Sequence, residues 1–227
     1  MKNQYFGDNR DLLKFDLVFQ IVKEGLADRF SYIPMLTEDV AEADGPDVRR
    51  CEASGGVRNA ALVDLLDKSI INQKREIGQL DEFFKGNGIE ANIYQKDVYF
   101  THEGRKSYFS GIPRVWLTRS LILVDPDRGL EEDSNGAGNL LYSELAALYE
   151  RMDDDSYLMF TQRFPYDLYE AYLGMRCAEL KDRIPGSQPV SIDDLDSIIF
   201  FLTRNKFLQG RLVNLLKDYT QQYAKKD

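Results

Sequence analysis

The chain contains a single histidine and only two cysteines among its 227 residues. One histidine excludes a histidine-rich zinc site, and a serine or cysteine nucleophile that needs a histidine base would depend on His102 alone. Cys51 and Cys177 lie far apart, and neither has a second cysteine at metal-ligand spacing. We therefore expect free thiols in a reducing compartment.

Long apolar runs are also missing. The longest one, residues 198–202, has the length of a strand, far below the roughly 20 residues that cross a bilayer. Residues 1–5 lack the apolar segment of a secretory signal. The sequence predicts a cytoplasmic protein that has no membrane partner.

Positive charge is scarce relative to negative charge. Lysine and arginine number 29 against 38 acidic residues, so the net charge is −9. Such a chain does not bind nucleic acid through its overall field, because neutralising phosphates requires clustered basic side chains. Arg105, Lys106, Arg114 and Arg119 lie close in sequence and offer a local groove, although solvated charges around a loop are the favoured interpretation.

Apolar residues make up 43% of the chain, enough for a core, and their spacing predicts alternating helices and strands. Helices are expected over 9–25, 58–85, 140–151, 166–184 and 207–226, strands over 29–37, 89–100, 119–125, 156–162 and 195–203, and loops over 38–56 and 128–139. This alternation is typical of a mostly parallel sheet with helices on both faces. We expect one three-layer, Rossmann-like α/β domain over residues 1–227.

Ligands of such sheets bind at the carboxyl ends of the strands. The sequence Asp125-Pro126-Asp127 follows the clearest strand, and a proline there fixes the backbone between two carboxylates. Other strands are followed by further polar side chains, namely Thr37, Gln162, Arg163 and residues 203–205. We expect a functional site centred on Asp125 and Asp127.

Two segments carry a resemblance to a known family. The stretch "YFGDNRDLLKFDLVFQIV" (5–22) is similar to the first helix of the large-subunit ribosomal RNA adenine-N6 methyltransferases, with Gly7, Asp11, Leu13 and Lys14 on matching positions. The stretch "RSLILVDPD" (119–127) resembles their strand that ends in Asp-Pro-Pro-Tyr. The chain is also similar to bacterial proteins that begin with Asn-Gln-Tyr-Phe-Gly-Asp and carry an Asp-Pro-Asp-x-Gly-Leu-Glu strand end, and this second resemblance implies no activity.

The methyltransferase resemblance implies a site for S-adenosylmethionine and for a nucleic-acid base or another amine. Asp125 would accept a hydrogen bond from the exocyclic amine, and Pro126 would shape the pocket beside it. Lys14, Thr37, Gln162 and Arg163 would line the site, the last two because strand 156–162 would lie beside strand 119–125.

The sequence departs from that family in two places. Residues 35–45, "MLTEDVAEADG", contain no Gly-x-Gly where the family's backbone passes against the methionine part of the cofactor. Asp127 and Arg128 replace a proline and an aromatic residue, so the face that stacks on a target base is missing. We expect the fold to be kept and the cofactor loop to be degenerate.

A second hypothesis is a Mg²⁺- or Mn²⁺-dependent nuclease or phosphodiesterase. Its hard oxygen ligands would be Asp125, Asp127, Glu131 and Glu132, with Arg128 or Arg163 facing a phosphate.

A third hypothesis is a non-catalytic binding protein that uses the same scaffold. Residues 97–111 predict a hairpin in which aromatic side chains such as Tyr108, interleaved with Arg105 and Lys106, could stack bases, although such residues more often pack in the core or in a dimer contact.

Overall fold

The computed structural model describes residues 1–40, 48, 50, 54–131, 136–163, 169–194 and 197–223. Its elements are, in chain order, η1 (Asn3–Tyr5), α1 (Asn9–Lys23), β1 (Arg29–Ile33), α2 (Ala60–Ile71), α3 (Gln79–Gly86), β2 (Glu90–Ile93), α4 (Arg105–Ser110), η2 (Arg114–Leu117), β3 (Ser120–Val124), β4 (Gly129–Leu130), β5 (Asn139–Leu140), α5 (Tyr142–Arg151), β6 (Tyr157–Arg163), α6 (Tyr169–Arg183), β7 (Val190–Asp194), β8 (Ser197–Leu202) and α7 (Lys206–Tyr223).

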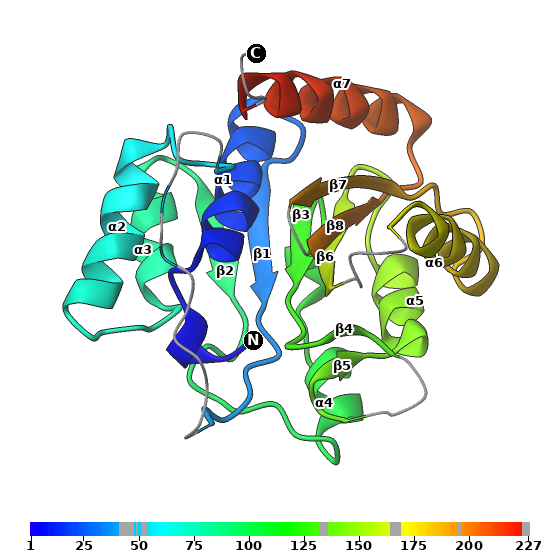
Figure 1. Ribbon diagram of the computed structural model, residues 1–227. Coiled ribbons are helices and arrows are strands. Elements are labelled where there is room, and N and C mark those ends of the chain that lie inside the picture. The colour runs from blue at the N-terminus through cyan, green and yellow to red at the C-terminus, as the bar shows by residue number, and fades with distance from the viewer. Residues whose placement is uncertain are drawn as a thin grey trace.

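A six-stranded, mostly parallel sheet forms the centre of the molecule (Figure 1). Its strand order is β2-β1-β3-β6-β8-β7, and β8 runs antiparallel to both of its neighbours. The predicted α/β class with a mostly parallel sheet is therefore confirmed, and the arrangement is Rossmann-like. β3 and β6 are parallel neighbours, so their carboxyl ends meet at one edge.

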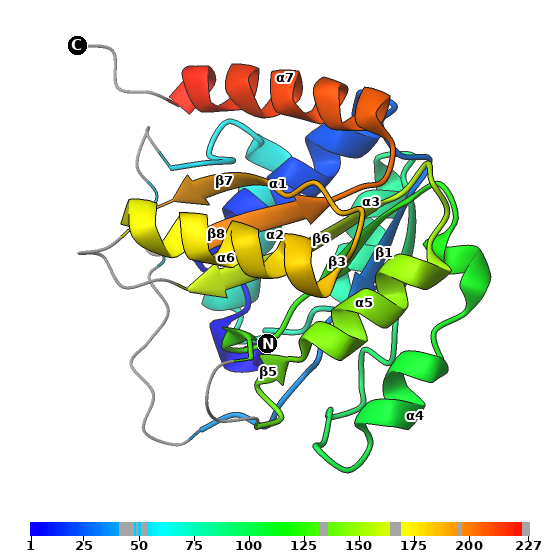
Figure 2. The ribbon, with the colours of Figure 1, turned by 90° about the vertical axis from the view of Figure 1, so that its right-hand side faces the viewer.

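Side chains alternate between two helical layers along each strand, as the period of two in a strand requires. Leu121, Leu123 and Met159 belong to the cluster that includes α1, α2, α3 and α7. Ile122, Val124 and Phe160 belong to the cluster beneath α4, α5 and α6. Figure 2 shows α5 and α6 in front of the sheet, on the side away from α1 and α2. Both faces of the central strands are buried, which explains their continuous apolar sequences.

The start of α1 is fixed by two carboxylates. Asp8 is the N-cap, and its Oδ1 accepts from the backbone nitrogen of Asp11 at 2.9 Å. Asp11 Oδ2 in turn accepts from the backbone nitrogen of Gly7 at 2.9 Å. Gly7 has a φ of +98°, a backbone conformation that favours glycine. These bonds set the direction of α1 and, with it, the position of Lys14.

The single helix predicted over 58–85 is wrong, because two helices, α2 and α3, occupy this range. Gln73 adopts a left-handed φ of +53°, and the backbone nitrogen of Lys74 reaches back to Ser69 O at 2.9 Å. That bond ends α2 in the manner of a Schellman motif. The apolar spacing did not reveal the break, since residues on both sides of it face the same core.

The strand predicted over 89–100 is shorter, and the hairpin predicted over 97–111 is wrong. β2 ends at Ile93, because Gln95 turns the chain with a φ of +45°. Residues 105–110 form the helix α4, with Arg105 and Tyr108 buried. The guanidinium of Arg105 binds Glu144 at 2.7 Å, and the Tyr108 ring packs edge-on against Phe100. Neither side chain can stack a base, which removes the basis of the third hypothesis at this segment.

The end of the chain also differs from the sequence interpretation. β7 was not predicted, because its residues "VSIDD" alternate weakly and form an edge strand. The strand predicted over 195–203 is β8, which is antiparallel. Residues 203–205 therefore leave the sheet at the edge opposite Asp125, and Arg204 instead donates to Met152 O at 3.1 Å. None of the helices in the described part of the chain has the length and hydropathy of a membrane span.

Candidate functional site

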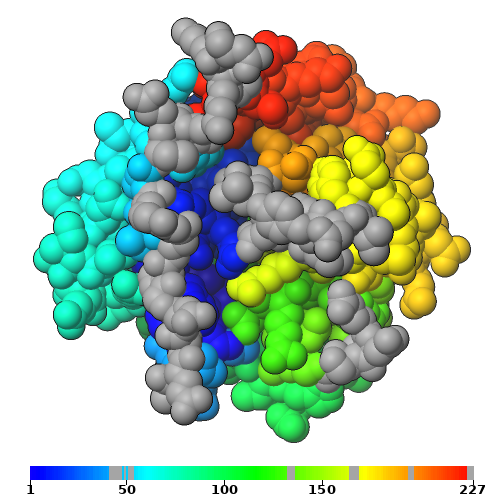
Figure 3. Space-filling view, in the orientation of Figure 1, coloured from blue at the N-terminus to red at the C-terminus, as the bar shows by residue number. Residues whose placement is uncertain are grey.

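A pocket with a volume of about 80 Å³ opens at the carboxyl ends of β3 and β6, next to the start of α1. Figure 3 shows the N-terminal part of the chain, in blue, at the centre of this side of the molecule. The predicted residues that line the pocket are Lys14, Asp125, Pro126, Asp127, Gln162 and Arg163. The structure thus brings together six of the seven side chains that the sequence singled out. Thr37 lies beside them and contacts the pocket residue Lys2.

Asp125 is the buried centre of this site, with 3% of its surface exposed. It follows Leu121 and Leu123 at a spacing of two, so its side chain points toward α1. Its Oδ2 accepts from Lys14 Nζ at 2.7 Å and from the hydroxyl of Tyr32 at 2.7 Å. Its Oδ1 has a longer contact, from Thr161 Oγ1 at 3.4 Å. Oδ1 therefore keeps capacity for a further donor.

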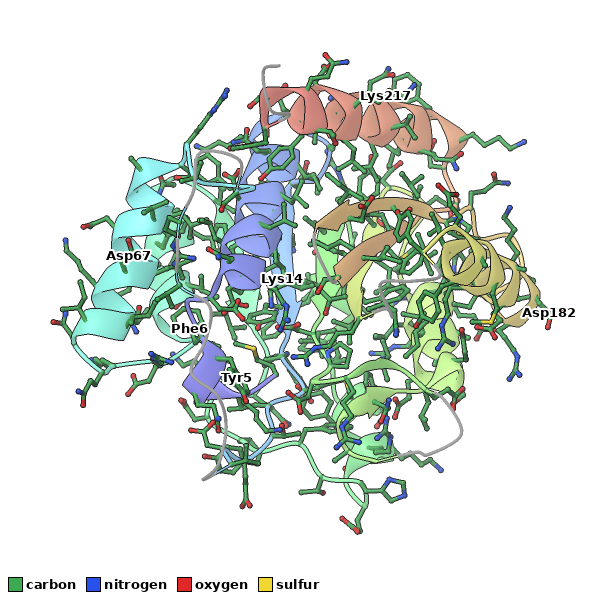
Figure 4. The ribbon with its side chains drawn as sticks, in the orientation of Figure 1. Tyr5, Phe6, Lys14, Asp67, Asp182 and Lys217 are labelled. Carbon is green, nitrogen blue, oxygen red and sulfur yellow. The ribbon has the colours of Figure 1, made fainter. Side chains whose placement is uncertain are left out.

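Lys14 is held between two carboxylates. Its Nζ lies 2.7 Å from Asp125 Oδ2 and 2.8 Å from Asp11 Oδ1, at the centre of the molecule in Figure 4. Burial lowers the pKa of Lys14, but Asp11 and Asp125 outweigh it and raise the pKa above its ordinary value. A lysine that stays charged cannot remove a proton from a ligand, so Lys14 acts here by positioning Asp125.

Asp127 is tied to the N-terminal segment. Lys2 Nζ lies 2.6 Å from Asp127 Oδ2 and also donates to Thr37 Oγ1 at 3.2 Å. Burial would raise the pKa of Asp127, yet the amino group of Met1 and then Lys2 lower it. Asp127 is thus an ionised carboxylate whose charge is already balanced inside the pocket.

Gln162 lines the pocket, but its amide is committed to the protein. It follows Leu158 and Phe160 at a spacing of two and therefore points to the face opposite Asp125. Its Oε1 accepts from the backbone nitrogen of Leu130 at 2.6 Å, and its Nε2 donates to the hydroxyl of Tyr172 at 2.6 Å. Thr161 is the β6 side chain that faces Asp125, and the same spacing of two from Met159 could have identified it.

Asp8, the N-cap of α1, also lines the pocket, and the sequence did not single it out as a site residue. Burial raises the pKa of its carboxyl group to about 7, the neighbouring charge of Asp11 adds to the shift, and Lys14 and Arg10 oppose it. A carboxyl group that titrates near neutral pH can exchange a proton with a ligand. Lys2 and Tyr32 were missed as well, since no apolar pattern marks them as site residues. Asp11 lies on a position that matches the family resemblance, but it was given no role in the site.

The acidic turn does not gather into a metal site among the described residues, where no group of three potential ligands is found. Asp125 and Asp127 each bind a lysine instead. Glu132, one of the four proposed ligands, lies outside the described residues, as does Cys51. Cys177 is a free thiol, half-buried in α6.

Met35 and Leu36, which follow β1 closely, do not fit a cradle for S-adenosylmethionine. Met35 and Leu36 have 0% and 2% of their surface exposed, where a glycine-lined cradle would be needed. The amino nitrogen of Met1 donates to Met35 O at 3.4 Å and to Asp125 O at 3.3 Å, and Thr37 donates from its backbone to Met1 O at 2.8 Å. The backbone groups of Met35, Thr37 and Asp125 that make these bonds are occupied by the chain itself, and residues 41–45 of the loop lie outside the described residues.

Comparisons with known proteins add no relative to these observations. No family model matches the chain, and no curated protein matches it. The function must therefore be inferred from the pocket.

Proposed function

We propose that this chain is a methyltransferase-fold protein whose pocket recognises an exocyclic amine, such as the 6-amino group of adenine, through Asp125. One observation carries the proposal: the two oxygens of this carboxylate are unequally used. Lys14 and Tyr32 saturate Oδ2, whereas Oδ1 has only the 3.4 Å contact from Thr161. An amine that enters the pocket would donate to Oδ1.

The hydrogen bonds of Asp125 support this role. Lys14 and Tyr32 both donate to its Oδ2, so the side chain already acts as an acceptor. A buried acceptor discriminates strongly between a ligand that donates and one that does not. The methyltransferase resemblance predicts that β3 and β6 are neighbours, and their parallel pairing agrees with this prediction.

The size of the pocket limits what enters it. An enclosed apolar cavity of about 150 Å³ binds benzene, whereas this open pocket has about 80 Å³. We therefore expect the amine-bearing edge of the base to enter the pocket and the rest of the ligand to lie over its mouth.

The proposal includes no methyl transfer. Met1, Met35 and Leu36 fill the position that the resemblance gives to the methionine part of the cofactor. We expect the site to have kept the recognition of the amine while its cofactor loop became degenerate.

Calorimetric titration with adenosine and with inosine tests the proposal. Inosine has a carbonyl oxygen where adenosine has the 6-amino group, so the two ligands differ at the atom that meets Asp125. We expect adenosine to bind about tenfold more tightly, which corresponds to ~1.4 kcal/mol. Equal affinities would overturn the recognition of the amine.

A parallel titration with S-adenosylmethionine tests the degenerate loop separately. We expect no saturable binding at millimolar cofactor. Saturable binding in the micromolar range would show that the cofactor can displace the N-terminal segment. It would overturn the expectation that Met1, Met35 and Leu36 exclude the cofactor.

A further inference from the structure

The pocket is locally basic although the chain is acidic. Five cationic side chains line it, from Lys2, Arg10, Lys14, Arg128 and Arg163, against four carboxylates, from Asp8, Asp11, Asp125 and Asp127. The whole chain carries a net charge of −9. A positively charged pocket concentrates anions at its mouth, even on a negatively charged protein.

The two lysines of this group form ion pairs with carboxylates of the pocket, whereas two of the arginines are exposed to solvent. Lys2 and Lys14 form short ion pairs with Asp127 and Asp125. Arg128 and Arg163 are exposed, and neither forms a salt bridge with another residue in the described ranges. Their guanidinium groups keep donors that a ligand can use.

The fold places these two arginines at the mouth of the same pocket. The backbone nitrogen of Arg128 donates to Gly138 O at 2.8 Å, which anchors the residue beside the short strands β4 and β5. The backbone oxygen of Arg163, at the end of β6, accepts from Gln162 Nε2 at 2.8 Å. Both backbones are fixed, and only the side chains are left to close on a ligand.

We infer that Arg128 and Arg163 form a phosphate subsite and that the ligand is a purine nucleoside monophosphate with an exocyclic amine. Guanidinium groups bind phosphate oxygens through paired, charge-assisted hydrogen bonds. This inference rests on the proposed function, since the amine enters at Asp125 while the phosphate stays at the mouth. It adds a second recognition point that uses other residues.

A single nucleotide suits the charge of the molecule better than a nucleic acid strand does. The affinity for a nucleic acid strand depends on how many of its phosphates basic side chains neutralise, and the arginine pair Arg128 and Arg163 matches a single phosphate group. The further phosphates of a nucleic acid strand would be repelled by the net negative charge of the protein.

Calorimetric titration with AMP and adenosine at low ionic strength tests the phosphate subsite. The wild-type protein should bind AMP at least about tenfold more tightly than adenosine. The variant R128Q/R163Q should lose this advantage, so that it binds AMP and adenosine with similar affinities. Arg114 is exposed in η2, which precedes β3 and therefore lies at the end of the sheet opposite the pocket. The control variant R114Q should behave like the wild type.

Three outcomes would overturn the inference: equal binding of AMP and adenosine, an equal loss in R114Q, or tighter binding of a five-residue oligoadenylate than of AMP. Inorganic phosphate should compete with AMP and leave adenosine binding unchanged. Failure of the proposed function gives a different result. Adenosine and inosine then bind with equal affinity, whether or not AMP binds more tightly than adenosine.

Discussion

Lys14 Nζ lies 2.7 Å from Asp125 Oδ2, although 111 residues separate the two along the chain. The pair joins α1 to the end of β3, and both side chains are about 5% exposed or less. A buried ion pair holds its members in one geometry. Removing either partner leaves the other as an uncompensated buried charge, which destabilises the fold. The shape of the pocket therefore depends on this contact.

Replacing Lys14 by methionine should destabilise the protein by about 3–5 kcal/mol, because Asp11 and Asp125 then remain buried without their cation. Urea unfolding followed by circular dichroism measures the change. Lys217, an exposed lysine on α7 (Figure 4), gives the control Lys217→Met, which should lie within ~0.5 kcal/mol of the wild type. The double variant K14M/D125N should recover part of the loss, and the absence of any recovery would show that the two residues are not coupled.

Asp8→Asn should stabilise the protein above pH 7. The pKa of Asp8 is raised to about 7 in the folded state, so between about pH 4 and pH 7 the unfolded chain releases this proton first and the wild type loses stability. Asparagine keeps the N-cap and carries no charge. The difference between variant and wild type should be near zero below pH 4, grow up to pH 7 and then stay constant at about 1–3 kcal/mol. A difference that is independent of pH would contradict the raised pKa.

Two glycine-to-alanine substitutions should have opposite effects. Gly129 has a φ of +97°, and a Cβ there would collide with the amide of Gln162, so Gly129→Ala should destabilise by roughly 2 kcal/mol or more. Gly210 lies inside α7 with no atom near its Cβ position, so Gly210→Ala should stabilise by about 1 kcal/mol. Thermal unfolding of both variants checks the signs.

Much of the fold could be predicted from the sequence where buried strands leave uninterrupted apolar runs. β3 and β6 were placed to within one residue, because strands buried on both faces are apolar throughout. The edge strand β7 and the break before α3 were missed, since one has a weak pattern and the other depends on the left-handed turn at Gln73. Whether 105–110 forms a hairpin or a helix was settled by tertiary packing around Phe100.

The site could be predicted in position but only partly in chemistry. Residues after the strand ends did converge on one pocket, as parallel strands require. The partners that decide their roles, Tyr32, Lys2 and Asp8, come from other elements, and no local pattern connects them to Asp125. Gln162 and Thr161 could be told apart only through the alternation along β6.

The most direct measurement of the role of Asp125 is the ligand preference of Asp125→Asn. Lys14 and Tyr32 donate to the Oδ2 position, so the asparagine oxygen must take that position and its amino group must occupy the position of Oδ1. The variant would then present a donor to the pocket in place of an acceptor.

We predict that the preference is reversed: Asp125→Asn should bind inosine, whose carbonyl oxygen accepts, more tightly than adenosine. Asp182→Asn, a control at the periphery in Figure 4, should keep the preference of the wild type for adenosine. A folded Asp125→Asn protein that still prefers adenosine would contradict the recognition of an amine by this carboxylate.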